Sequence, residues 1–196
     1  MKPRRRRSTD VSTAVATATE APRASTQAAF EALYRESRDD VFAYVAGLLR
    51  DRSAAEEVTS AAFEKAWRKR RQIDPERGSA RTWLFGIARN AALDELRRLS
   101  RRADLRDDAS AESAEAAGYP VGPSGGDPAE VAIRRTALRQ AMASLNGRER
   151  ELIALKFFAG LSNSEIAEVI GASETNAGTR IHRVVQKLRR FFDEAA

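Results

Sequence analysis

The chain has 196 residues, no cysteine and one histidine, His182. This composition excludes disulfides and cysteine nucleophiles and argues against zinc clusters, so we expect no metal and no cofactor. Alanine, leucine, arginine and glutamate are frequent and aromatic residues make up 7%, which predicts an all-α chain of one or two small domains.

The net charge of +6 is unevenly distributed along the chain. Residues 99–130 hold three basic and seven acidic side chains, whereas the segments on either side are basic. A basic excess suits a polyanion such as DNA, although many surfaces that bind nothing are equally basic. No apolar run reaches the roughly 20 residues that span a bilayer. The basic cluster at 4–7 is not followed by a hydrophobic export segment, so we expect a cytoplasmic protein without membrane insertion.

Residues 1–26 are rich in serine, threonine, alanine and arginine and show no helical stripe, which predicts a disordered basic tail. Such a tail is either an inert extension or a nonspecific phosphate-binding arm. Residues 27–98 then show apolar residues at three- and four-residue steps, typical of helices. The first of these are Phe30, Leu33, Tyr34, Val41, Tyr44, Val45, Leu48 and Leu49.

Three features divide this first helical domain. Asp39 or Asp40 is expected to interrupt the first helix. Another helix is expected to begin near Ser53, as N-cap with Glu56 three residues later, and to run through Trp67. Residues 72–80 contain a proline and a glycine and predict a loop.

The tract 82–98 carries aromatic, polar and basic residues on one predicted helical face. That face holds Trp83, Asn90, Asp94 and Arg97, whereas the opposite face holds Leu84, Ile87, Ala88, Ala91, Ala92 and Leu96. Glu95 falls within the apolar face, so the pattern is imperfect. The polar face either contacts a partner or simply faces water, and Trp83 either stacks on a base or anchors the core.

The segment 99–130 is rich in glycine, proline and acidic residues, and predicts a flexible linker. Helical periodicity resumes in a second domain, 131–196, and stops briefly at Asn146 and Gly147. It continues with Leu152, Ile153, Leu155, Lys156 and Phe157.

Residues 161–190 follow the pattern of a helix-turn-helix, with a short helix, a turn at Gly171 and a longer helix capped by Ser173. In the longer helix Ala177, Ile181, Val184 and Leu188 form an apolar stripe. The residues expected to point outward are Thr175, Asn176, Thr179, His182, Arg183 and Gln186. They suit base edges and phosphates, and the alternative is an ordinary helical hairpin with a polar face.

Two motifs in this order resemble the extracytoplasmic-function (ECF) sigma factors, the promoter-recognition subunits of bacterial RNA polymerase. The first motif is an acidic pair, Phe and Trp, then Trp-Leu, Ile-Ala, Asn, Asp and Arg-Arg. Here it reads Glu56, Glu57, Phe63, Trp67, Trp83, Leu84, Ile87, Ala88, Asn90, Asp94, Arg97 and Arg98. The second motif is met by Glu165, Ile166, Ala167, Gly171, Ser173, Glu174, Arg180, His182, Arg183 and Leu188.

This resemblance implies a region 2-like bundle and a region 4-like helix-turn-helix, with no catalytic residue. Core polymerase, through its clamp and flap, and promoter DNA would be the partners, together with an anti-sigma factor. The implied −10 contacts are Arg77, Ser79, Trp83, Asn90, Asp94, Arg97 and Arg98. The implied −35 contacts are the six outward residues together with Arg180. The implied polymerase contacts are Glu56, Glu57, Ser60 and Glu64.

The chain departs from the family pattern at two places. Ser60 and Ala61 replace a glutamine and an acidic residue, which is expected to weaken or redistribute the clamp contact. Gly178 replaces a long side chain inside the recognition helix, which removes a possible phosphate contact. Two other functions stay open at this point: a repressor or response-regulator output protein that acts without polymerase, and a helical protein-binding adaptor.

Overall fold

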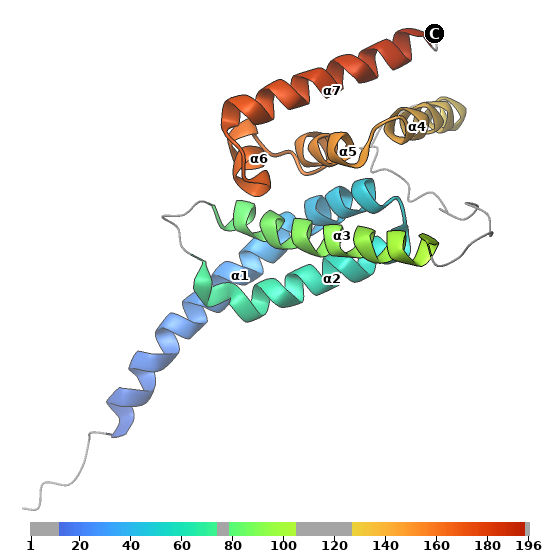
Figure 1. The fold of residues 1–196 in the computed structure, drawn as a ribbon. Helices are drawn as coiled ribbons and strands as arrows, with labels where there is room; N and C mark the ends of the chain where they lie inside the picture. Colours follow the sequence, from blue (N-terminus) through green and yellow to red (C-terminus); the bar gives the residue numbers. More distant parts are fainter. Residues whose placement is uncertain (1–11, 74–78, 105–126, 195–196) are drawn as a thin grey trace, which may run out of the picture.

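The computed structural model describes residues 12–73, 79–104 and 127–194, and every regular element in these ranges is a helix (Figure 1). This confirms the all-α prediction. The N-terminal unit consists of α1 (Ser12–Leu49), α2 (Arg52–Lys69), a short 3-10 turn (Arg70–Gln72) and α3 (Ala80–Asp104). The C-terminal unit consists of α4 (Pro128–Ala143), α5 (Gly147–Ile153), a π-helical turn (Ala154–Phe158), α6 (Asn163–Ile170) and α7 (Glu174–Glu194).

The helix boundaries differ from the sequence expectations at several points. α1 begins at Ser12, inside the segment expected to be a tail, and runs through Pro22. The helix also passes through Asp39 and Asp40 without the expected break. α3 extends six residues past the predicted domain end, to Asp104. Residues 1–11, most of the expected linker (105–126) and the loop residues 74–78 lie outside the described ranges.

The first helical turn of α2 corrects the predicted cap. The chain bends at Arg50, which has a φ of 59°, and Asp51 accepts a hydrogen bond from the backbone N–H of Ala54 at 3.0 Å. Asp51 is therefore the N-cap, and Ser53 lies within the first turn of the helix. An aspartate is as good a cap as a serine, and here it stands where the chain leaves the bend.

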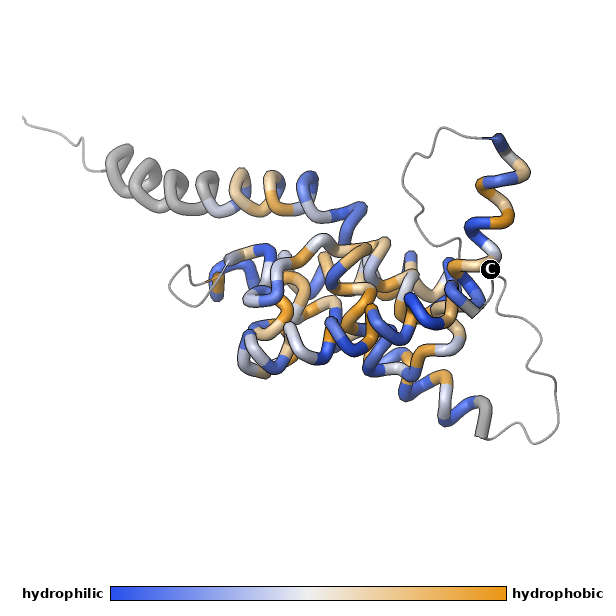
Figure 2. Tube along the Cα trace, turned by 90° about the horizontal axis from the view of Figure 1, so that it is seen from above, coloured by the Kyte–Doolittle hydropathy of each residue, from blue (hydrophilic) through white to orange (hydrophobic). Residues whose placement is uncertain are grey.

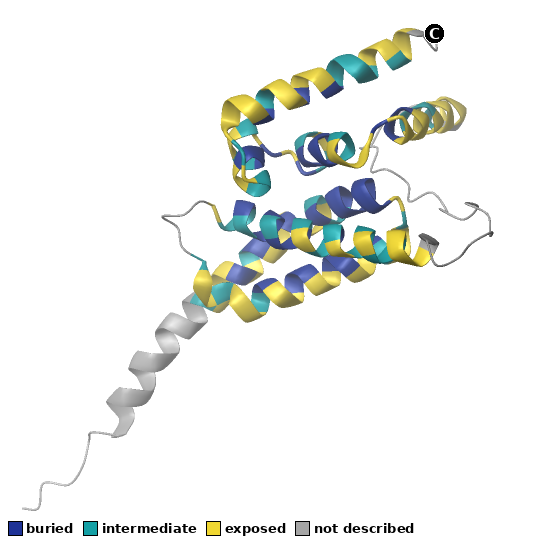
Figure 3. Ribbon diagram, viewed as in Figure 1, coloured by how far each residue is buried: buried dark blue, intermediate teal, exposed yellow. Residues whose placement is uncertain are grey.

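The core of the N-terminal unit lies where α1, α2 and α3 face one another (Figure 3). Tyr44 of α1 and Phe85 of α3 are fully buried, and their rings meet edge to face with centroids 5.8 Å apart. At the outer end of the bundle, Trp67 meets Phe30 in the same geometry, and Tyr34 meets Phe63. Tyr34 was expected in the apolar stripe, but 42% of it is exposed.

The C-terminal unit is organised by its helix caps. Asn146 and Glu149 form a reciprocal capping box at α5, and Ser162 and Glu165 form another at α6. α6 ends at Gly171, whose φ of 69° is a left-handed conformation that glycine adopts without steric cost. The predicted turn at Gly171 is thereby confirmed. Ser173 accepts a hydrogen bond from the N–H of Asn176 at 3.3 Å, which confirms the predicted cap of α7.

The two units pack directly against each other and share one continuous hydrophobic core. α1 contacts α5 and the π-helical turn, and α3 contacts α6. Figure 2 shows the hydrophobic residues concentrated where the helices cross and the hydrophilic residues on the outer turns. Within the described ranges, none of the helices has the length and apolar character needed to cross a membrane.

Candidate promoter and polymerase interfaces

α3 presents the polar face that its sequence predicts. Asn90, Asp94 and Arg97 are exposed, whereas Leu84 and Ala88 on the opposite side are fully buried. Ser79 precedes the helix, and its hydroxyl accepts a hydrogen bond from the N–H of Thr82 at 3.0 Å. The Ser79 hydroxyl therefore satisfies a free N–H at the start of the helix, in addition to any role toward DNA.

Trp83 is half-buried, and its indole packs against the shared hydrophobic core. Trp83 therefore anchors α3 on the bundle. This agrees with the interpretation of Trp83 as a core residue. Trp83 lies near the N-terminal end of the same helix that carries Asn90. A tryptophan in this position contributes to the core and still leaves part of its ring accessible to a partner.

Two arginines on the second half of α3, Arg97 and Arg98, each have a carboxylate partner one turn earlier. Arg97 donates to Asp94 at 2.7 Å, and Arg98 forms a two-pronged contact with Glu95. The hydrogen bond with Glu95 raises the pKa of Arg98. Glu95, which interrupted the apolar pattern in the sequence, is largely covered and has this arginine as its partner. Arg77, the remaining predicted −10 contact, lies outside the described residues.

α7 separates its core-facing and outward residues as predicted. Ala177, Ile181 and Val184 are buried, and Leu188 is half-buried. Six of the predicted −35 residues are exposed, and Gln186 is half-buried. The six exposed residues are Thr175, Asn176, Thr179, Arg180, His182 and Arg183.

Gly178 has a packing role that the sequence did not reveal. It is half-buried in the first turns of α7, and a methyl group added there would lie 3.3 Å from the side-chain nitrogen of Asn163 in α6. The position therefore faces the neighbouring helix, and a longer side chain at 178 would first have to displace Asn163. Gly178 therefore lies where α6 and α7 approach each other closely.

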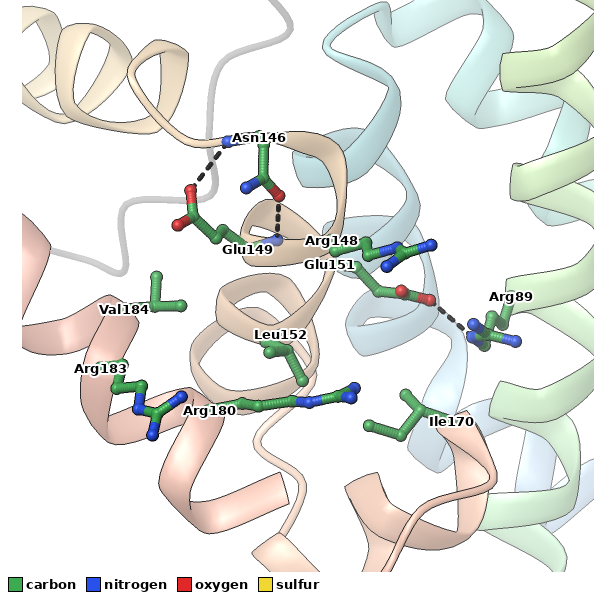
Figure 4. Close-up of a pocket in the computed structure, with 10 residues that line it drawn as sticks. All are labelled: Arg89, Asn146, Arg148, Glu149, Glu151, Leu152, Ile170, Arg180, Arg183 and Val184. Carbon is green, nitrogen blue, oxygen red and sulfur yellow. Dashed lines mark hydrogen bonds and ion pairs between the residues drawn. The ribbon is translucent and has the colours of Figure 1, made fainter. Parts of the chain in front are cut away.

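A cleft of about 400 Å³ lies among α5, α6 and α7, with Arg89 of α3 at its edge, and Figure 4 shows Arg180 of α7 extending across it. Its walls also carry Arg148 and Arg183, and none of these three arginines has an ion-pair partner among the described residues. The other charges are paired: Arg89 with Glu151, and Glu149 with Lys187. Arg180 and Arg183 of α7 are therefore available for phosphates.

The expected polymerase contacts all lie exposed on α2: Glu56, Glu57, Ser60 and Glu64. Glu56 pairs with Arg52 at 3.0 Å, and Glu64 pairs with Arg68. Glu56 and Ser60 also line a groove of about 620 Å³ between α1 and α2, whose floor includes Phe42 and Phe63. The sequence analysis missed Tyr34, Arg38 and Phe42 of α1 as part of this surface. The exposed position of Tyr34 within an apolar stripe was not visible in the sequence.

The described residues contain no group of three or more histidine, aspartate or glutamate side chains placed to hold a metal ion. The surface features of the described residues are two polar helical faces and a partly aromatic groove that carries both arginine and carboxylate side chains. This combination suits binding to DNA and to a protein.

Comparison with known protein families finds a matching family model for each unit of the chain. Residues 33–102 match the model of sigma-70 region 2, and residues 135–188 match that of sigma-70 region 4. The chain belongs to the ECF RNA polymerase sigma factors. Proteins of this class bind core RNA polymerase and direct promoter-specific transcription initiation, and this chain is a sigma factor of that kind.

Among curated relatives, the chain is 30% identical over 171 residues to the ECF RNA polymerase sigma factor SigL of Mycobacterium tuberculosis. The alignment covers 87% of this chain and 93% of SigL. It is 26% identical to SigK of Mycobacterium bovis, with 85% of this chain and 87% of SigK covered.

Two solved structures share the fold. The first is the sigma factor RpoE in complex with the anti-sigma factor NepR from Bartonella quintana, with a TM-score of 0.66 and 21% identity over 84% of this chain and 96% of that chain. The second is CnrH in complex with the cytosolic domain of CnrY, with a TM-score of 0.61 and 22% identity over 87% of this chain and 91% of that chain.

Proposed function

We propose that the three surfaces of this sigma factor divide promoter recognition between them. The polar face of α3, with Asn90 at its centre, captures the opened strand of the −10 element. The exposed face of α7, with Arg180 and Arg183, binds the −35 element in the major groove. The groove beside Glu56 and Ser60 receives the polymerase clamp, and region 4 contacts the flap. The protein carries no catalytic residue of its own and works in the cytoplasm with the polymerase.

The observation that carries this assignment is that one chain exposes two separate polar helical faces of different character. The face of α3 offers an amide at Asn90 and part of an indole at Trp83, which together suit hydrogen bonding and stacking with an unpaired base. The face of α7 offers short polar side chains and unpaired arginines on a helix with a free outer side, which suits a duplex groove. A duplex-binding repressor needs only the second face.

An anti-sigma factor is the regulatory partner that we propose for this chain. One similar solved structure is a complex of the sigma factor RpoE with the anti-sigma factor NepR, and another is a complex of CnrH with the cytosolic domain of CnrY. Here such a partner would compete with polymerase for the groove between α1 and α2, where acidic and aromatic side chains lie close together.

Run-off transcription with purified core polymerase and a promoter library tests the function as a whole. We expect promoter-dependent transcripts only when the chain is added. Tight duplex binding without polymerase, combined with no transcript from any template, would instead identify a repressor. Binding to protein partners but neither to DNA nor to polymerase would identify an adaptor.

The division between the two faces is tested with Asn90→Ala and Arg183→Ala. Asn90→Ala should reduce open-complex formation, measured by permanganate footprinting, more than duplex binding, measured by gel shift. Arg183→Ala should weaken duplex binding at every salt concentration. Ser100→Ala and Arg139→Ala are matched controls, because both residues are exposed and lie outside the proposed faces. Equal losses in both assays for Asn90→Ala would remove its assignment to strand capture.

A further inference from the structure

We infer that the cleft among α5, α6 and α7 binds a small phosphorylated ligand, which Arg148, Arg180 and Arg183 hold by its phosphate oxygens. The surfaces proposed for the −10 element, the −35 element and the polymerase do not require a ligand in this cleft. The site itself depends only on the geometry around the cleft, whereas its effect on promoter binding rests on the proposed function.

The cleft has the shape of a small-ligand site. Its volume of about 400 Å³ lies at the lower end of the range for pockets that bind small molecules. Figure 4 shows Arg180 reaching from α7 across the cleft toward Ile170 of α6, and Arg148 extending from α5. A helix that reads a duplex groove uses its outer side. The concave space beside α7 is therefore not explained by a −35 contact alone.

The lining of the cleft carries more positive charge than its own carboxylates balance. It contains four arginines and two glutamates. Glu151 pairs with Arg89 at 2.5 Å, and Glu149 pairs with Lys187 at 2.8 Å. The three remaining arginines have no ion-pair partner among the described residues. A bound anion would supply the negative charge that this lining lacks.

A capping box and an ion pair hold the two helices that carry these arginines in place. At the start of α5, Asn146 accepts a hydrogen bond from the N–H of Glu149 at 3.0 Å, and the Glu149 carboxylate accepts from the N–H of Asn146 at 2.9 Å. The same carboxylate accepts from Lys187 of α7 at 2.8 Å. α5 and α7 are therefore joined beside the cleft. The backbones at Arg148 and Arg180 are already in position before a ligand binds, which lowers the cost of binding.

Phosphate is the ligand group that suits this lining. A guanidinium group donates two parallel hydrogen bonds to phosphate oxygens, and one phosphate has oxygens for more than one arginine. A single carboxylate carries only one negative charge and would leave most of the arginine charge unbalanced. The rest of the lining includes apolar side chains, since Leu152 and Val184 are buried and Ile170 is half-buried. The ligand class is therefore a small molecule with a phosphate or diphosphate group and an apolar or aromatic part, such as a nucleotide.

A ligand in the cleft would compete with promoter DNA. Arg180 and Arg183 lie on the exposed face of α7 that we propose for the −35 element. A ligand that binds these two arginines removes two phosphate contacts that are otherwise available to the duplex. A phosphate of the DNA backbone offers the same oxygens, so the experiments must separate a free ligand from the DNA itself.

Calorimetric titration of the full-length chain tests the site directly. The probes are inorganic pyrophosphate and ATP, each added without DNA. We expect both to bind the parent chain, and Arg148→Ala to weaken both by about tenfold through the loss of one charge-assisted contact. Arg139→Ala is the matched control, since this exposed arginine of α4 lies outside the cleft. No binding of either probe to the parent chain, or an equal loss in Arg139→Ala, would overturn the inference.

A gel shift with a duplex fragment that carries the −35 element separates the two sources of phosphate. Sodium chloride at the same ionic strength is the reference for pyrophosphate. At ten times its dissociation constant, pyrophosphate should weaken duplex binding by the parent chain about tenfold, and by Arg148→Ala only about twofold. Weaker duplex binding by Arg148→Ala, together with no binding of either free probe, would assign the cleft to the DNA backbone and contradict a small ligand.

Failure of the site and failure of the proposed function give different results. The absence of a promoter-dependent transcript from any template, with pyrophosphate binding and its loss in Arg148→Ala intact, would reject the proposed function and leave the site standing. Pyrophosphate binding with an unchanged duplex affinity would reject the competition with promoter DNA.

Discussion

The two helices that we propose to contact DNA, α3 and α7, hold their arginines in different ways. On α3, Arg97 and Arg98 are each paired with a carboxylate one turn earlier. On α7, Arg180 and Arg183 have no ion-pair partner among the described residues. A paired arginine must break its ion pair with the carboxylate before it can bind a phosphate. An unpaired arginine gains the phosphate contact without losing another one. The N-terminal unit is therefore suited to selective hydrogen bonding, and the C-terminal unit to electrostatic attraction.

The largest expected effect on stability comes from comparing a buried ring of the N-terminal unit with an exposed ring of the C-terminal unit. Phe85→Ala removes a fully buried ring that packs on Tyr44 and should lower the free energy of unfolding by about 3–5 kcal/mol. Phe157→Ala removes a ring that is 58% exposed and should change stability little. Urea unfolding followed by circular dichroism measures both. Equal effects of the two variants would mean that the core does not lie where the structure places it.

The comparison of the arginines predicts a difference in salt dependence. Arg183→Ala should reduce the slope of log affinity against log salt by about 0.9, the value for one phosphate contact on duplex DNA. Arg97→Ala should reduce it less, because Asp94 already neutralises this arginine in the free protein. Gel shifts of polymerase complexes at several salt concentrations give the slopes. A larger change for Arg97→Ala than for Arg183→Ala would reverse the assignment of roles.

A smaller effect concerns the pH dependence of the C-terminal unit. The hydrogen bond from Lys187 at 2.8 Å lowers the pKa of Glu149, as does the N–H of Asn146. A carboxyl with a lowered pKa in the folded state stabilises the fold at pH values above its ordinary value of 4.5. This contribution is lost as the pH falls through the lowered value. Glu149→Gln keeps a capping side chain but removes the charge, so its stability should fall less than that of the parent between pH 7 and pH 3 in urea unfolding.

Much of the fold could be predicted because the signals are local. The apolar stripe of α7, the turn at Gly171 and the cap at Ser173 each depend on residues within one or two helical turns. The caps of α2 were harder, since Asp51 and Ser53 are both good capping residues and only the bend at Arg50 decides between them. The exposed residues of α3 followed from periodicity alone, but their function at a promoter stays a prediction.

The docking of the two units could not be predicted from the sequence, because it depends on contacts between distant residues. Gly47 reads as one more small residue in a helix until Phe158 is placed against it. The π-helical turn has no sequence signature that we recognised; Phe157, expected in the apolar stripe, is 58% exposed, whereas Phe158 is partly buried. Likewise the sequence gives no reason to single out Glu151, and only the fold shows it buried with Arg89 as its ion-pair partner.

The smallest expected effect compares one glycine in α3 with one in α7. In an open position, replacing a helical glycine with alanine stabilises the helix by about 0.5–1 kcal/mol. Gly86 of α3 is such a position, since nothing lies within 4 Å of an added methyl group. At Gly178 of α7 the same methyl group meets the Asn163 side chain at 3.3 Å. Displacing that amide offsets part of the stabilisation of the helix. Gly86→Ala should therefore raise the midpoint of urea unfolding more than Gly178→Ala. An equal gain at both positions would show that Asn163 yields freely, and that α6 does not restrict residue 178 of the recognition helix.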